Sequence, residues 1–220
     1  MVFPKQFKEP FGLSFHRVKV CLEAMEINNK SQRLFVDMDG TLAVFKPVDT
    51  LEKLYEKDYF IKLEPQMNVI DGVRHIIRNN PNIEVFVLSA VLSDSMYAIS
   101  EKNAWLDKYL PEVDVEHRLY PSCGESKKEF LTGLYGEVRP DDFLLDDYSK
   151  NLHEWEPPAK GIKVMNGING KYGTWTKDKV SIECDGKTFA ECVVNIMQRR
   201  VQEYDMSSKN QNHLVRGGHR

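Results

Sequence analysis

The stretch LFVDMDGTLA, Leu34–Ala43, is the most informative part of the chain. An apolar run, Leu34–Val36, leads directly into two carboxylates two residues apart, Asp37 and Asp39, and a Gly-Thr pair follows. We interpret the run as a buried β-strand whose carboxyl end delivers both carboxylates onto a glycine turn. Carboxylates at such a position are costly unless they are paired, protonated or bound to metal. The pattern therefore indicates a functional site.

The remainder of the chain alternates between strand-like and helix-like segments. The apolar patterns predict strands at residues 34–36, 83–88, 118–120, 143–145 and 179–184. Helices are predicted at residues 68–80 and 94–110, after the capping box formed by Ser126 and Glu129, and finally through residues 189–201. Strands separated by helices predict an α/β fold with a doubly wound, mostly parallel, Rossmann-like sheet flanked by helices.

Three further motifs are expected at the same edge of this sheet as the first. They are VFVLSA at Val85–Ala90, GESKKE at Gly124–Glu129 and DFLLDDY at Asp142–Tyr148. Ligands of such sheets bind beyond the carboxyl ends of the strands, where all four motifs are expected to lie. The convergence of distant segments on one crevice is stronger evidence for a site than any single motif.

One segment interrupts the alternation. Residues 43–65 are rich in Lys, Glu, Tyr and Leu and are mostly helical in character. We interpret them as a small helical cap inserted after the first motif, and an ordinary surface excursion is the alternative. The core is expected to span residues 31–206, with an N-terminal extension at residues 1–30 and a flexible tail at residues 207–220.

Composition narrows the class of protein. The 220 residues carry a formal net charge of -3, which argues against binding a nucleic-acid polymer through a basic surface. No stretch approaches the roughly 20 apolar residues of a membrane helix, and the N-terminus does not resemble a secretory signal. The four cysteines form no C-x-x-C pair, so we expect reduced thiols in a cytoplasmic protein. The oligomeric state stays open, and a homodimer is compatible with the sequence.

The residue types of the first motif suit phosphoryl transfer. Asp37 can attack phosphorus directly, because its carboxylate is ionised at neutral pH and the resulting acyl phosphate can then be hydrolysed. Asp39 can protonate the departing oxygen and later activate a water molecule. A magnesium ion held by carboxylates would reduce the repulsion between this nucleophile and a phosphate. The metal ligands that we expect are Asp37, Asp39, Asp146 and Asp147.

Three positions are expected to hold the phosphate oxygens. Ser89 can donate from its hydroxyl, and the backbone at Ala90 lies beside it. Lys127, in the first turn of its predicted helix, adds a positive charge where the helix dipole already favours anions. Lys128 is adjacent, so the sequence leaves open which of the two lysines serves.

The four motifs in order resemble those of the haloacid dehalogenase superfamily of aspartate-nucleophile phosphatases, over about Leu34 to Trp155. Within it the chain resembles the 5'(3')-deoxyribonucleotidases, through YFIKLEPQMNVIDGV, PNIEVFVLSA and LLDDYSKNLHEW. The region Ile162–Trp175 looks like a bacterial and phage-type branch of that family. Ser89 departs from the threonine of the better-known relatives, but it also supplies a hydroxyl.

The resemblance implies specific roles. It makes the first Asp of the motif the nucleophile, the second the acid/base and magnesium the cofactor. It also places cap aromatics in the nucleoside pocket, which implicates Phe60 and Tyr59, although Phe60 could instead belong to the core of the cap. The expected function is a magnesium-dependent phosphomonoesterase, a 5'-nucleotidase acting on (deoxy)nucleoside monophosphates. Phosphatases of sugar phosphates or other metabolites, and a non-catalytic binding protein on the same fold, are the alternatives.

Overall fold

The computed structural model describes residues 32–46, 48–168 and 174–199, which belong to one compact unit. The predicted N-terminal extension and flexible tail lie outside the described residues. Among the described residues, no helix has the length and apolar character needed to cross a membrane.

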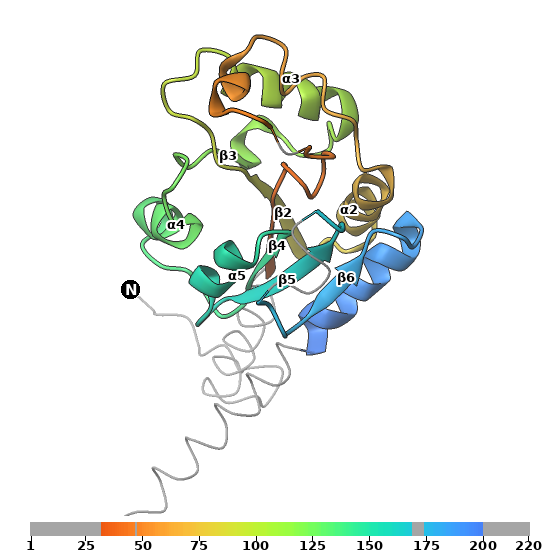
Figure 1. Cartoon of the computed structure of the whole chain (residues 1–220). Coiled ribbons are helices and arrows are strands. Elements are labelled where there is room, and N and C mark those ends of the chain that lie inside the picture. Colours follow the sequence, from red (N-terminus) through yellow and green to blue (C-terminus); the bar gives the residue numbers. More distant parts are fainter. Residues whose placement is uncertain (1–31, 47, 169–173, 200–220) are drawn as a thin grey trace, which may run out of the picture. The chain divides into compact units, whose positions relative to one another are not determined.

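The core of this unit is a six-stranded sheet in the order β3-β2-β1-β4-β5-β6, with parallel pairing between neighbouring strands (Figure 1). The strands are β1 Gln32–Val36, β2 Ile83–Leu88, β3 Arg118–Leu119, β4 Asp142–Asp146, β5 Lys160–Met165 and β6 Lys179–Ser181. From β1 the chain first moves toward β3, and from β4 it moves the other way toward β6. The strand order therefore reverses between β1 and β4, which is where such sheets bind ligands.

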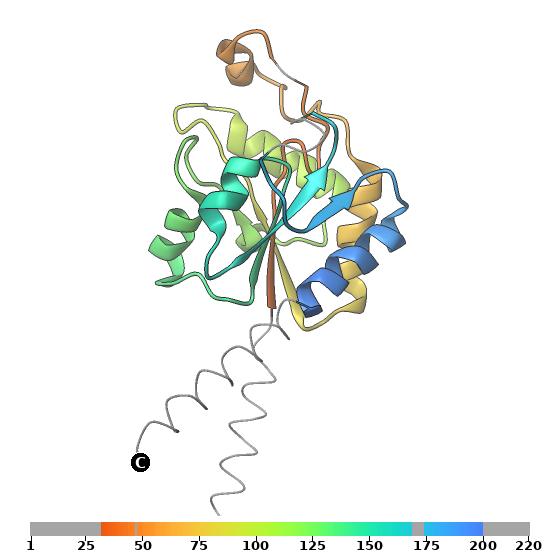
Figure 2. The ribbon, with the colours of Figure 1, turned by 60° about the horizontal axis from the view of Figure 1, so that its bottom comes forward.

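Alternating side chains of the strands build a separate core on each face of the sheet. Leu34 and Val36 of β1 pack with α2, Met67–Asn79, with α3, Ala98–Tyr109, and with a helix at residues 186–199. Phe35 faces the other way, toward α4, Lys127–Tyr135, and α5, Ser149–Trp155. Figure 2 shows α2 and the last helix on one side of the sheet and α4 and α5 on the other. The predicted doubly wound, mostly parallel fold is confirmed.

One strand and one α-helix, β5 and α5, escaped the sequence analysis. Strand β5 contains lysines at both Lys160 and Lys163, which break the apolar pattern expected for a buried strand. Helix α5 has only seven residues, too few to show a helical period. Helix α3 begins at Ala98, later than the predicted residue 94, because the preceding residues form turns and Ser95 Oγ accepts the amide hydrogen of Ala98.

The inserted segment, residues 43–65, leaves and rejoins the core at one place. Ala43 pairs with Pro65 in an antiparallel bridge, and the Val44 amide donates to the Glu64 carbonyl at 2.8 Å. The expectation of a mostly helical segment is wrong for its described residues, which form turns and one 3-10 helix, η1, Leu51–Tyr55. None of the η1 residues is buried, so this stretch lacks the apolar face that stabilises a longer helix.

Candidate active site

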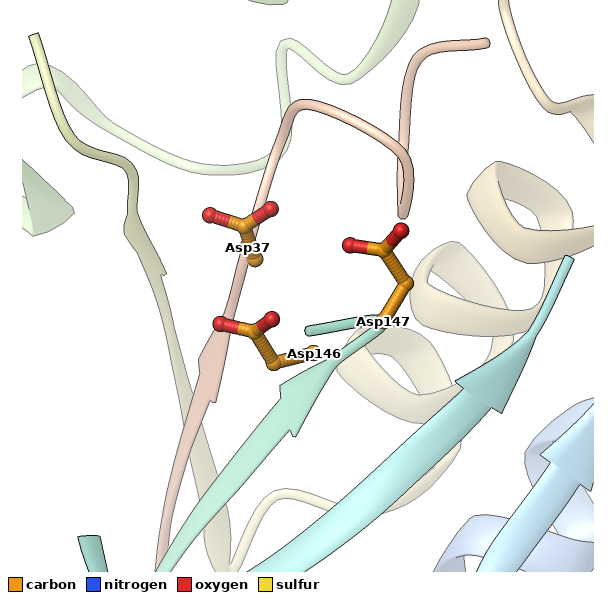
Figure 3. Close-up of side chains that lie close together, drawn as sticks. All are labelled: Asp37, Asp146 and Asp147. Carbon is orange, nitrogen blue, oxygen red and sulfur yellow. The ribbon is translucent and has the colours of Figure 1, made fainter. Parts of the chain in front are cut away.

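Three carboxylates meet at the carboxyl ends of the two central strands (Figure 3). Asp37 follows β1, and Asp146 and Asp147 end and follow β4. All three residues are buried, and each offers an oxygen within 4.8 Å of those of the others. The sheet itself brings them together, because the Asp37 amide donates to the Leu145 carbonyl at 2.9 Å and extends the pairing of β1 with β4.

The buried side chain of Lys127 bridges two of the three carboxylates. The Lys127 ammonium donates to Asp37 Oδ1 at 2.6 Å and to Asp146 Oδ2 at 2.7 Å. Its position follows from the start of α4, where Ser126 Oγ accepts the amide hydrogen of Glu129. Lys128 points elsewhere and donates to the Pro157 carbonyl. Of the two adjacent lysines, the structure therefore brings Lys127 to the predicted nucleophile.

The electrostatics of the cluster are dominated by burial and by an excess of negative charge. Burial raises the pKa of Asp37 to about 8, with Asp146 adding to the rise while Lys127 opposes it. Burial lowers the pKa of Lys127, but Asp146 and Asp37 together raise it by more, so the pKa lies above its ordinary value. The lysine therefore stays charged and balances only part of the carboxylate charge.

This donor set fits a magnesium ion. Mg²⁺ prefers oxygen ligands and is commonly held by one or two carboxylates together with waters and substrate phosphates. Asp37, Asp146 and Asp147 offer carboxylate oxygens only, in a buried position where a cation would reduce their mutual repulsion. The side chain of Asp39, predicted from the sequence as a fourth ligand, lies outside this group of described residues.

The loop that carries Asp147 is held by residues that the sequence did not reveal. Asn166, just after β5, donates to the Gly40 carbonyl at 2.5 Å and to Asp147 Oδ2 at 2.8 Å. Gly40 has a φ of 91°, and a Cβ there would lie 2.5 Å from Asp147 Oδ2. Glycine is thus required both for the backbone conformation and for the close approach of the carboxylate. Asn151 from α5 similarly donates to Asp146 Oδ2 at 2.9 Å.

Asp39 belongs to a second group of side chains. Its Oδ2 accepts a hydrogen bond from the Lys102 ammonium at 2.5 Å, and Ser89 Oγ lies 3.4 Å away. Lys102 comes from α3, is fully buried, and also donates to Ser89 Oγ and the Ala90 carbonyl, both at 2.8 Å. The sequence predicted Ser89 and Ala90 at the site, but it gave no signal for Lys102, which looks like an ordinary polar position of a helix.

The two predicted aromatics of the inserted segment, Tyr59 and Phe60, differ in exposure. Phe60 is 5% exposed and packs with Val91 and Ala98, so its ring has little free surface. Tyr59 is half-buried and meets the Phe60 ring edge-on at 5.0 Å. Burial and the charge of Asp39 both raise the pKa of Tyr59, so its hydroxyl lies within electrostatic reach of that carboxylate. Of these two aromatics, Tyr59 is therefore the one with surface available beside the site, and the role of Phe60 stays a prediction.

Comparison with known proteins finds likeness in structure alone. No protein-family model matches the sequence, and no curated protein matches it either. The D,D-heptose 1,7-bisphosphate phosphatase of Burkholderia thailandensis superposes with a TM-score of 0.50 at 11% identity, covering 74% of this chain and 99% of that one. The HAD domain of the effector protein Lem4 from Legionella pneumophila gives a TM-score of 0.43 at 11% identity, covering 78% and 97%. At this identity the first likeness concerns the fold: the chain has the Rossmann-like α/β fold of that phosphatase.

Proposed function

We propose that the protein is a magnesium-dependent phosphomonoesterase of the haloacid dehalogenase superfamily, working through an aspartyl-phosphate intermediate. The observation that carries the proposal is the buried cluster of Asp37, Asp146, Asp147 and Lys127 at the point where the strand order reverses. The order of the sequence motifs and the likeness of the fold to a known phosphatase support it.

In this proposal Asp37 is the nucleophile. Lys127 holds Asp37 Oδ1, which orients the carboxylate and compensates part of the charge that meets an incoming phosphate. Attack by Asp37 forms a bond from its oxygen to phosphorus, and the bond from phosphorus to the ester oxygen breaks with its electron pair leaving on that oxygen. A magnesium ion bound by Asp37, Asp146 and Asp147 would neutralise the charge that otherwise repels a phosphate dianion from this carboxylate.

Asp39 serves both half-reactions in turn. It first gives a proton to the leaving oxygen, so that an alcohol rather than an alkoxide departs. It then takes a proton from water, whose oxygen attacks phosphorus and breaks the bond to Asp37, releasing inorganic phosphate. Ser89, beside Asp39, can donate its hydroxyl to a phosphate oxygen.

The substrate class that we propose is a (deoxy)nucleoside monophosphate. The resemblance of the cap to that of the deoxyribonucleotidases supports it, and so does the exposed surface of Tyr59 near Asp39. An aromatic ring can stack on a base for roughly 1–3 kcal/mol, which is about ten- to a hundredfold in affinity. Phe60 would hold the Tyr59 ring in place through the edge-on contact of the two rings.

A phosphate-release screen with Mg²⁺ tests the proposal. The panel contains nucleoside monophosphates with phosphate at the 5' or 3' position, sugar phosphates and p-nitrophenyl phosphate. We expect hydrolysis that stops on chelation, with a nucleoside monophosphate preferred by about tenfold or more over sugar phosphates. Preference for a sugar phosphate would refute the nucleotidase hypothesis and keep the broader phosphatase hypothesis. Absence of any hydrolysis would favour a non-catalytic binding protein.

The aromatic assignment has its own test in two neighbouring variants. Tyr59→Ala should raise KM for the nucleotide about ten- to a hundredfold and leave hydrolysis of p-nitrophenyl phosphate almost unchanged. Tyr59→Phe keeps the ring and should stay close to wild type. Phe60→Ala should instead lower stability by about 3–5 kcal/mol, because it empties a buried aromatic site. A nucleotide-specific rise in KM for Phe60→Ala without loss of stability would return the pocket role to Phe60.

A further inference from the structure

We propose that Lys102 is a positioning residue for Asp39, and that Glu101 and Lys102 together couple the inserted segment to this acid/base group. The inference rests on the proposed function, because it assigns a task to Asp39 in ester cleavage. It concerns residues of α3, which the sequence motifs do not include.

The ammonium of Lys102 is saturated and fixed. It has three N–H donors, and it donates to three acceptors: Asp39 Oδ2 at 2.5 Å, Ser89 Oγ at 2.8 Å and the Ala90 carbonyl at 2.8 Å. The residue is fully buried, so its ammonium cannot exchange these acceptors for water. A buried lysine is costly unless its charge is paired and hydrogen-bonded, and Asp39 is the carboxylate that pairs with it.

This contact makes the two oxygens of Asp39 unequal. Oδ2 is held by Lys102, whereas Oδ1 is covered and has no hydrogen-bond partner among the described residues. With Oδ2 hydrogen-bonded to Lys102 and Oδ1 enclosed by protein, the Asp39 carboxylate is held in one orientation. Lys102 therefore sets the orientation in which Asp39 acts as an acid.

The neighbouring residue, Glu101, ties the same turn of α3 to the inserted segment. Its Oε1 accepts the Asp58 amide hydrogen at 2.5 Å, and its Oε2 accepts that of Phe60 at 3.0 Å. Glu101 is 7% exposed, so both bonds lie in a largely water-free place. Trp105, one turn further along α3, adds a hydrogen bond from its indole to the Leu63 carbonyl at 2.8 Å.

Phe60 connects the segment that Glu101 holds to the ammonium of Lys102. Its ring covers the Lys102 ammonium, which lies 4.7 Å from the ring centroid. The segment that Glu101 anchors therefore shields the Lys102–Asp39 pair from water, and electrostatic contacts are stronger where water is excluded. Displacement of residues 58–60 would uncover the pair and loosen Asp39, so the segment is coupled to the acid/base group as well as lying near the substrate.

The consequence is specific to the leaving group. p-Nitrophenolate departs readily without a proton, whereas phenolate and alkoxides need one from the general acid. Phenyl phosphate and p-nitrophenyl phosphate have nearly the same shape, so their ratio of kcat/KM reports acid assistance with little influence from the pocket. Correctly placed acid catalysis contributes about 10²–10⁴-fold, and only part of this is lost when the acid is misplaced.

The test compares this ratio in four proteins supplied with Mg²⁺. Lys102→Met should lower kcat/KM for phenyl phosphate at least about tenfold more than for p-nitrophenyl phosphate. Glu101→Ala should shift the ratio in the same direction by less. Arg118→Met is the matched control, because Arg118 is another buried cation bonded to α3, at the Asn103 carbonyl, and its hydrogen bonds and ion pair go to residues other than Asp39. It should lower Tm and leave the ratio unchanged.

Equal losses on both esters, or no loss, in Lys102→Met would overturn the positioning role. If that variant does not fold, Lys102→Gln keeps a hydrogen-bond donor without the charge and is judged by the same ratio. Failure of the proposed function looks different, because the wild-type protein would then hydrolyse neither ester and Asp37→Asn would change nothing.

Discussion

The two central strands carry buried charges at both ends, and the two ends are built differently. At the amino end, Arg33 of β1 lies opposite Asp142 of β4 in the sheet register. Its Nε donates to Asp142 Oδ1 at 2.7 Å, and its Nη2 to Oδ2 at 2.6 Å. At the carboxyl end of the same strands, three carboxylates lie together and the ammonium of Lys127 bridges two of them, Asp37 and Asp146.

The difference separates a structural charge pair from a candidate metal-binding cluster. The guanidinium fork matches both oxygens of Asp142, and the Arg139 amide donates to the same carboxylate at 2.6 Å. Burial lowers the pKa of Arg33, but the hydrogen bond and charge of Asp142 raise it by more, so the guanidinium stays charged beside its partner. The carboxyl end is left with net negative charge in a buried place. In the proposed function, a metal cation would complete this cluster.

The largest effect that should distinguish the two ends is the loss of activity in Asp37→Asn, at the carboxyl end. We expect phosphate release to fall by about 10³-fold or more, because an amide cannot serve as the covalent nucleophile. Tm measured without metal should not fall, since the change removes one of several crowded carboxylates. Near-normal turnover in this variant would refute the proposed mechanism.

The corresponding change at the amino end is Asp142→Asn, and its effect should be on stability. Removing one partner of a buried ion pair leaves Arg33 without its compensating charge, and we expect a loss of about 3–5 kcal/mol in the free energy of unfolding. Urea unfolding gives the stability, and kcat per folded molecule should equal that of the wild type. A loss of kcat without a loss of stability would mean that the two ends are not independent.

The sequence predicted the acidic cluster at the carboxyl end of the strands but missed the Arg33–Asp142 pair at the amino end. Parallel strands bring their carboxyl ends to one edge, so Asp37, Asp146 and Asp147 could be grouped from short local patterns alone. The capping box at Ser126 likewise placed Lys127 in the first turn of its helix, as the structure has it. Arg33 and Asp142 are separated by 109 positions, and nothing local marks them as partners.

Residues that act through long-range packing were beyond sequence reasoning for the same reason. Lys102 becomes a partner of Asp39 only because α3 packs beside the first motif, 63 positions away. Asn166 reaches Gly40 across 126 positions, from a strand that was itself not predicted. The inserted segment shows the opposite error: its composition suggested helix, but without a buried face it forms turns and one 3-10 helix.

Metal binding should also distinguish the two ends, because Mg²⁺ should bind and stabilise the carboxyl end only. A Mg²⁺ concentration 100 times its dissociation constant would add about 2.7 kcal/mol to the free energy of unfolding. Thermal melts should show this gain in wild type and in Asp142→Asn, and most of it should be lost in Asp146→Asn. Ca²⁺ should also stabilise the protein but inhibit turnover, because its looser shell lets the nucleophile bind with both oxygens. Equal stabilisation of all three proteins by Mg²⁺ would place the metal elsewhere.

The smallest expected effect, counted per pH unit, is a pH dependence that belongs to the carboxyl end. Without metal the pKa of Asp37 is raised from 3.8 to about 8 in the folded protein, chiefly by burial. Below about pH 4 the group is protonated in both states and contributes nothing. Between about pH 4 and pH 8 the unfolded chain releases this proton while the folded protein retains it, so the free energy of unfolding falls as pH rises, and above pH 8 the loss is constant. The metal-free wild type should therefore lose stability relative to Asp37→Asn by about 1 kcal/mol per pH unit across this window. Saturating Mg²⁺ should abolish the slope, because the cation stabilises the carboxylate.

Urea unfolding at a series of pH values measures the difference in stability between the two proteins. A flat curve between pH 4 and pH 8 would show that Lys127 alone already compensates Asp37.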